Sequence, residues 1–86
     1  MAISFRWNWW NEAQIEKHGV SKEEAEHVVL NARRPYPKHS RNETWLVIGR
    51  GQGTRPLEVV YVEDEDDRDL LFIIHAMPLT TRSRRG

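Results

Sequence analysis

Three strand-like segments fill the second half of the chain and constrain its fold more than any other feature. They are residues 44–49 (TWLVIG), 56–62 (PLEVVYV) and 70–77 (LLFIIHAM), and all are rich in β-branched, leucine or aromatic side chains. A glycine-rich segment separates the first two, and the acidic segment 63–69 separates the last two, as is typical of hairpin turns. Three strands joined by short turns predict an antiparallel meander. We expect the third strand, apolar on both faces, at the centre of the sheet.

The first half of the chain begins with a short strand and a capped helix. Residues 3–7 (ISFRW) alternate apolar and polar side chains, which predicts a strand. Asn8 is placed to cap a helix that begins at Trp9 and ends at His18. Gly19 then supplies the left-handed conformation in which many helices end.

A second helix follows and carries the clearest local signal in the sequence. Ser21 and Glu24 have the spacing of a capping box, and Val20 and Ala25 have that of a hydrophobic staple. We expect this helix to continue to about Asn31. Its apolar face would comprise Ala25, Val28, Val29 and Ala32, and its outward face Lys22, Glu23, Glu26 and Asn31.

The predicted order of elements is β-α-α-β-β-β in a single domain, residues 1–86. Two helices before a meander define an α+β fold, in which a small antiparallel sheet is packed by two helices. A last short helix is expected to start at Pro78 or Leu79. A chain of this length buries only roughly 60–65% of its unfolded surface, so each large aromatic side chain is an important part of the core.

Three of the four tryptophans lie close together, as Trp7, Trp9 and Trp10. Neighbouring residues of a helix point about 100° apart, so Trp9 and Trp10 cannot fully share one environment. Trp7 and Trp10 are three residues apart and can both turn toward the sheet, where we expect them in the core. Trp9 is then the exposed tryptophan and the candidate for binding a partner, because exposed indoles are enriched at interfaces.

Composition excludes several classes of protein and site. The chain has no cysteine, which excludes a disulfide scaffold and a cysteine-ligated zinc site. Its four histidines are scattered without a ligand spacing, so we expect no metal and no cofactor. No apolar run is long enough to span a membrane, and the first residues lack a signal-peptide pattern. We therefore expect a soluble, cytoplasmic protein.

Charge is balanced overall but unevenly placed. The chain has thirteen basic and thirteen acidic residues, and this zero net charge argues against a protein that coats nucleic acid. Six of the acidic residues lie within 63–69, whereas basic residues gather within 33–41 and 82–85. A local basic site for nucleic acid is therefore still open.

Short motifs along the chain resemble one family. They are Phe5–Asn8 (F-x-W-N), Lys17–Ser21 (K-H-G-V-S), Glu23–Ala25 (E-E-A), Ile48–Arg50 (I-G-R) and Ile73–Ala76 (I-I-H-A). In this order and over nearly the whole chain, they resemble the BrnT family of toxins from prokaryotic toxin–antitoxin pairs. The resemblance implies a RelE/ParE-like ribonuclease fold, RNA cleavage that halts growth, and a DNA-binding antitoxin that neutralises the toxin.

The sequence departs from the family pattern at three positions. Asn8 stands where the family usually has aspartate, and Phe72 and Met77 stand where it commonly has arginine. The missing cations leave a second hypothesis open, a non-catalytic interaction module of the same fold. Pairing of the apolar strands between two copies would give a homodimer, which is also left open.

Cleavage of RNA without a metal needs three groups. One removes the 2′-hydroxyl proton, one stabilises charge on the phosphate, and one assists the leaving 5′-oxygen. The candidate catalytic residues are Arg50, Tyr61, His75 and His39. Arg50 is foremost, because it matches the family motif and ends a strand beside a glycine-rich turn where a phosphate can approach the backbone. The ordinary alternatives are a solvated arginine and, for His75, a histidine held on a sheet face.

Three further arginines are candidates for RNA binding, namely Arg41, Arg55 and Arg82. Arg41 shares a basic loop with His39, and Arg82 lies in the basic tail, which could equally bind an antitoxin. Arg55 follows the glycine-rich turn.

Overall fold

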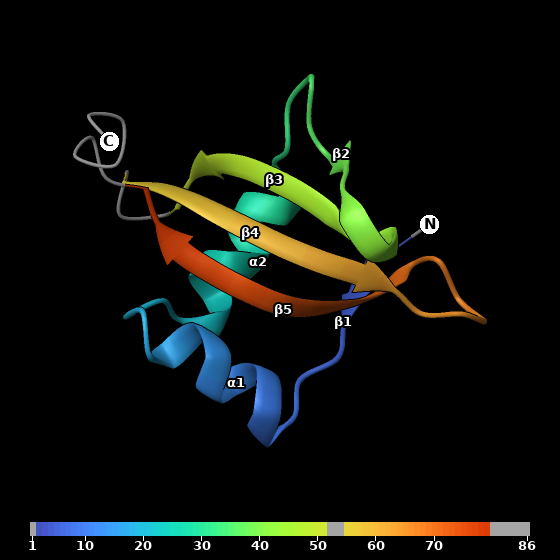
Figure 1. Cartoon of the computed structure of the whole chain (residues 1–86), viewed down its shortest axis with the longest axis horizontal. Coiled ribbons are helices and arrows are strands. Elements are labelled where there is room, and N and C mark those ends of the chain that lie inside the picture. The colour runs from blue at the N-terminus through green and yellow to red at the C-terminus, as the bar shows by residue number, and fades with distance from the viewer. Residues whose placement is uncertain (1, 52–54, 80–86) are drawn as a thin grey trace.

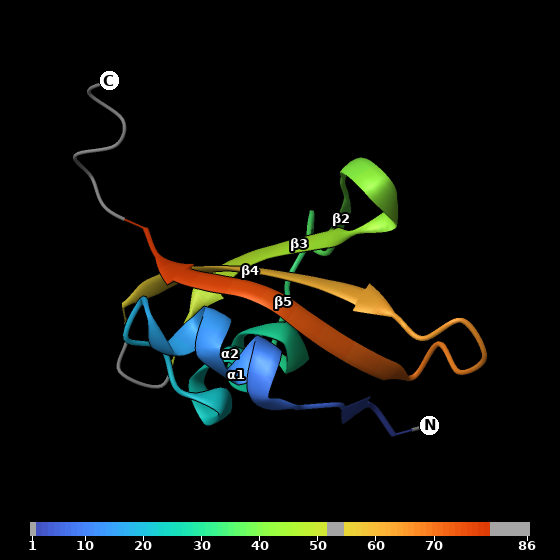
Figure 2. The same ribbon diagram turned by 60° about the horizontal axis from the view of Figure 1, so that its bottom comes forward.

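The computed structural model describes residues 2–51 and 55–79, and it has the predicted α+β architecture. In chain order the elements are β1 (Ser4–Phe5), α1 (Trp9–Glu16), α2 (Lys22–Leu30), β2 (Lys38–His39), the 3₁₀ turn η1 (Arg41–Glu43), β3 (Trp45–Arg50), β4 (Pro56–Glu63) and β5 (Leu70–Pro78). Both helices lie on one side of a single sheet (Figures 1 and 2). Within the described residues, neither helix is long and apolar enough to cross a membrane.

The sheet has five strands in the order β1-β5-β4-β3-β2. The predicted meander is confirmed, because β3, β4 and β5 pair antiparallel in succession. The middle strand is β4, so the expectation of a central β5 was wrong. Two short edge strands were not fully anticipated: β2 adds antiparallel to β3, and β1 adds parallel to β5. The sheet is therefore mixed rather than purely antiparallel.

Local side-chain chemistry begins both helices where the sequence predicted. The Asn8 side chain accepts hydrogen bonds from the backbone N–H groups of Trp10 and Asn11, and the Asn8 backbone N–H donates to Asn11 Oδ1 at 2.7 Å. Ser21 caps α2 by accepting from the Glu24 N–H at 3.0 Å. After α1, Gly19 has a φ of +74°, a conformation that glycine adopts without steric cost.

The core lies between the helices and the face of the sheet that they cover. Along β4, every second residue from Leu57 to Tyr61 is buried, as strand alternation requires. The helices bury Ile15 from α1 and Ala25, Val28 and Val29 from α2, with Val20 between them. The predicted apolar face of α2 is thus confirmed, with Ala32 partly buried against the core.

The tryptophans divide differently from the prediction. Trp7 packs against the core as expected, and its indole N–H donates to Glu26 Oε2 at 2.8 Å, so Glu26 does not face away from the protein. Trp10 was expected in the core but is 39% exposed. The reason is that α1 lies beside β5, where its first turn stacks the Trp10 indole on the Phe72 ring with centroids 6.2 Å apart. Trp9 is 81% exposed, as predicted.

The end of the described chain also differs from the prediction. Pro78 is the last residue of β5, and the Leu79 N–H donates to the Pro56 carbonyl at 3.0 Å, so no helix starts at either residue. The strand continues because this backbone hydrogen bond extends its pairing with β4.

Candidate functional site

An irregularity in β5 determines where His75 points. The strand pairs Tyr61 with Ile73 but Val60 with His75, so one extra residue, Ile74, is inserted at this point. Regular alternation from Ile73 would turn His75 toward the helices. A β-bulge changes the facing of the residues that follow it, and here it turns His75 to the sheet face away from the helices. We call this the open face.

On the open face His75 meets a carboxylate and a second histidine. Its Nε2 lies 3.2 Å from Glu58 Oε2, and its ring meets the edge of the His18 ring with centroids 5.7 Å apart. About a third of each side chain of the Glu58–His75 pair is exposed, so a ligand can reach it. We call Glu58, His75 and His18 the histidine cluster. Within the described ranges, no group of three or more acidic or histidine side chains is arranged to hold a metal ion.

Arg50 lies on the same face, at the end of β3. Gly49 faces α2, where an added Cβ would lie 3.5 Å from Val28, so alternation turns Arg50 to the open face. Arg50 pairs with Pro56, two residues before Glu58 in β4, which makes Arg50 and Glu58 diagonal neighbours across the strands. Diagonal neighbours on one face lie about 7–8 Å apart between Cα atoms, within reach of long side chains.

Tyr61 lies on the other face of the sheet. Its side chain is 6% exposed and belongs to the core beneath the helices. Burial, together with the negative charge of Glu63, raises the pKa of the Tyr61 hydroxyl above its ordinary value. The structure therefore does not bring Tyr61 together with Arg50 or His75.

His39 and Arg41 lie at the β2 edge of the sheet, beyond β3. The His39 ring packs against Trp45 with centroids 4.8 Å apart, and both His39 and Arg41 are exposed. Because the strands lie in the order β5-β4-β3-β2, this pair is separated from His75 by the width of β3 and β4.

Arg55 holds the start of α2 against the hairpin between β3 and β4. Its Nε and one terminal nitrogen each donate to a different Glu24 oxygen at 2.9 Å, and that nitrogen also donates to the Gly19 carbonyl at 2.7 Å. The hydrogen bond from Arg55 lowers the pKa of Glu24 below its ordinary value of 4.5. Gly51 lies so close that an added Cβ would be 2.6 Å from Glu24 Cγ. These contacts describe a structural clamp and explain why Glu24 does not complete the predicted capping box.

Two candidate residues stand apart from these groups. Trp9 is exposed on the first turn of α1, next to the Trp10–Phe72 stack. Arg82 lies outside the described residues.

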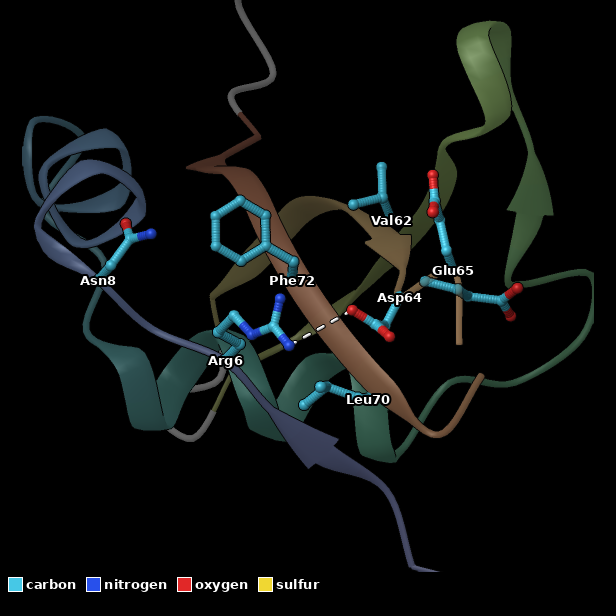
Figure 3. Close-up of a pocket in the computed structure, with 8 residues that line it drawn as sticks. Arg6, Asn8, Val62, Asp64, Glu65, Leu70 and Phe72 are labelled. Atoms are coloured by element: carbon cyan, nitrogen blue, oxygen red, sulfur yellow. Dashed lines mark ion pairs between the residues drawn. The ribbon is translucent and has the colours of Figure 1, made fainter. Parts of the chain in front are cut away.

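A pocket of about 290 Å³ lies at the other end of the open face, where β4 and β5 meet the acidic turn (Figure 3). Val62, Leu70 and Phe72 supply its apolar side chains, and Arg6 reaches across it to Asp64 with the two charged groups 3.3 Å apart. Glu63, Asp64 and Glu65 make the rim acidic. This acidic pocket repels a phosphate backbone and contrasts with the surroundings of Arg50.

Two residues of the histidine cluster had no assigned role in the candidate site. Glu58 is a carboxylate inside the otherwise apolar segment PLEVVYV, and this contrast is a signal that could have singled it out. His18 was interpreted only as the end of a helix. Neither residue could be joined to His75 without the strand register and the bulge, which sequence patterns do not specify.

Comparison with known proteins gives one family and one fold. Residues 12–78 match the family model described as "Domain of unknown function (DUF4258)". No curated protein sequence matches the chain. The crystal structure of the Brucella abortus ribonuclease toxin BrnT is similar, with a TM-score of 0.68 at 17% identity, over 94% of this chain and 99% of that one. The chain therefore has a BrnT-like fold.

Proposed function

The chain belongs to the DUF4258 family, and we propose that it is a metal-independent ribonuclease toxin whose active site is the histidine cluster with Arg50. The observation that carries the proposal is the Glu58–His75 contact of 3.2 Å, with the His18 ring against the His75 ring. A histidine paired with a carboxylate is a common arrangement for moving protons. The BrnT-like fold supports this choice of reaction, since the matched structure is described as a ribonuclease toxin.

In the proposed reaction His75 is the general base. With its Nε2–H donated to Glu58, Nδ1 carries the lone pair that accepts the proton of a ribose 2′-hydroxyl. The 2′-oxygen attacks phosphorus, and the bond from phosphorus to the 5′-oxygen breaks. A protonated His18 gives its proton to that leaving oxygen, so the products are a 2′,3′-cyclic phosphate and a 5′-hydroxyl.

Arg50 supplies the positive charge that the reaction needs. As the phosphate becomes pentacoordinate, negative charge grows on its two non-bridging oxygens, and a guanidinium can donate two parallel hydrogen bonds to them. The diagonal position of Arg50 relative to Glu58 supports this role. Tyr61 and His39 have no part in the proposed site, because Tyr61 is buried under the helices and His39 lies at the β2 edge.

We also propose that a cognate antitoxin binds the exposed Trp9 surface. The Trp9 indole is 81% exposed beside the Trp10–Phe72 stack, and such a large apolar surface in contact with water is unfavourable in a monomer. A partner that covers the indole would remove this cost. The proposed toxin needs a partner that neutralises it, and the family resemblance implies that this partner is a DNA-binding antitoxin. Trp9→Ala should then weaken neutralisation in co-expression without lowering RNA cleavage.

Cleavage of a long RNA by the purified protein in the presence of a chelator tests the proposed activity. Wild-type protein should cleave it, while His75→Gln and Arg50→Gln should each lose at least about 10²-fold in rate, the usual contribution of one acid–base group for His75 and of one charge-stabilising donor for Arg50. Arg68→Gln is the matched control, because it removes one positive charge at the acidic end of the molecule and should cleave normally. Circular dichroism shows that each variant is folded. No cleavage by folded wild-type protein would overturn the proposal and favour the non-catalytic interaction module.

A further inference from the structure

β2 covers only the first part of the outer edge of β3. β2 pairs with Trp45 and Leu46, and no described strand pairs with β3 beyond that point. A groove of about 490 Å³ lies there, between the end of β3 and the last turn of α2. Its lining residues are His27, Asn31, Arg33, Ile48, Gly49 and Arg50.

The chemistry of this edge groove suits a chain of phosphates. Two of its six lining residues are arginines, one is a histidine, and none is acidic. The Asn31 side-chain amide donates to the His27 carbonyl at 2.8 Å, which ties the loop after α2 to the helix end. Arginine pairs with phosphate oxygens through two parallel hydrogen bonds.

The edge groove is continuous with the proposed active site through Arg50. Arg50 lines the groove and is also the diagonal neighbour of Glu58, which contacts His75. A polymer that lies along the groove is therefore led over the end of β3 onto the open face. The acidic pocket lies at the opposite end of that face, near the turn from β4 to β5 (Figure 3). The open face therefore has a positive charge at the Arg50 end and negative charges at the pocket end.

We propose that the edge groove binds the phosphate backbone of single-stranded RNA on one side of the cleaved bond, with Arg33 as its outer phosphate contact. This inference rests on the proposed ribonuclease function and names where its substrate lies. Single-stranded RNA fits better than a duplex, because a groove of about 490 Å³ beside one strand edge has room for a single backbone. It fits better than an extended peptide, because the lining is cationic and has no acidic residue, which favours a phosphate backbone.

Binding of an uncleavable RNA tests the edge groove apart from catalysis. The probe is a fluorescein-labelled, fully 2′-O-methylated RNA 12-mer, which lacks the attacking hydroxyl, and the readout is fluorescence anisotropy. Arg33→Gln should raise the Kd at least fivefold. It should also reduce the slope of log Kd against log salt by about 0.7, the value for one phosphate contact with a single strand. Arg68→Gln, with the same change of net charge, should stay within twofold of wild type.

The outcomes separate this proposal from the proposed function. Equal effects of Arg33→Gln and Arg68→Gln, or no binding of the 12-mer by wild type, would overturn the proposal that the edge groove binds RNA. Cleavage of unmodified RNA by the same protein would still support the ribonuclease function. A selective effect of Arg33→Gln in a protein that cleaves nothing would support the groove and overturn the ribonuclease. In an active enzyme, Arg33→Gln should raise KM for long RNA more than it lowers kcat.

Discussion

The two faces of the sheet are made by alternate residues of the same strands, yet they differ in exposure, charge and chemistry. On the face beneath the helices, Val47, Leu57, Val59 and Ile73 are completely buried. On the open face, Ile48, Val60 and Phe72 are half-buried, as are Glu58 and His75. Side chains on the buried face therefore contribute most to the stability of the fold, whereas those on the open face are accessible to a ligand. Substitutions on the two faces should separate stability from activity.

The largest expected effect is on stability, at the buried face. Leu57→Ala removes a fully buried side chain and should lower the free energy of unfolding by about 2–5 kcal/mol. Val60→Ala, on the open face of the same strand, should cost about 1 kcal/mol or less. Urea unfolding followed by tryptophan fluorescence measures both. Similar losses for the two variants would contradict the division between the faces.

The next effect is on activity, at the open face. Glu58→Gln keeps the size of the side chain but removes the charge beside His75, and it should lower kcat for RNA cleavage at least about tenfold, as expected for a group that orients a catalytic histidine. KM should change little, and Glu58→Asp should recover part of the rate. The free energy of unfolding should stay within about 0.5 kcal/mol of wild type, since the pair is partly exposed. A loss of stability in proportion to the loss of rate would assign Glu58 to the fold instead.

A smaller effect depends on pH and tests the clamp between Glu24 and Arg55. The clamp holds the pKa of folded Glu24 below 4.5, so the unfolded chain binds this proton more readily than the folded one. The clamp therefore stabilises the fold above about pH 4.5, and this contribution is lost as the pH falls through the lowered pKa.

Comparison of wild type with Glu24→Gln in urea unfolding at several pH values measures this contribution. Wild type should be the more stable protein at pH 7, and the difference should shrink as the pH is lowered from 5 to 3. A difference that stays constant over that range would show that the charge of Glu24 is not what stabilises the clamp.

The smallest effect is expected at the acidic pocket. The Arg6–Asp64 contact is largely exposed on the arginine side, and exposed ion pairs contribute about 0–1 kcal/mol. Arg6→Gln should therefore change the free energy of unfolding by less than about 0.5 kcal/mol and leave RNA cleavage unchanged. Reduced cleavage in this variant would extend the proposed RNA surface to the acidic end and weaken its contrast with the edge groove.

The helix caps and the alternation of the strands follow from local sequence patterns, because they depend on interactions between residues close together in the chain. Asn8 and Ser21 cap their helices, and Gly19 ends the first one, through contacts within a few residues of the chain. The alternation of β4 likewise follows from its own residues. The prediction failed for Trp10, since helical spacing gives the angle between side chains but not the position of the helix beside the sheet.

The candidate site was less accessible to sequence reasoning. Arg50 and His75 were named from a family resemblance, and whether they act in catalysis is still a prediction. Their surroundings came from contacts between distant segments: His18 reaches His75 from the end of α1, and Glu58 reaches it from the neighbouring strand. Arg33 was noted only as part of the basic stretch 33–41, and His27 had no signal, because nothing local places the end of α2 beside the end of β3.

The amino-acid sequence by itself determined the helix ends, the three main strands and the α+β order, since caps, turns and alternation act over a few residues. The tertiary structure alone decided which face His75 occupies, because one inserted residue in the pairing of β5 with β4 reverses the alternation. It also decided that Arg55 serves the clamp and that Arg50 joins the open face to a cationic groove. Strand register and helix placement depend on packing across the whole core, and a local pattern contains neither.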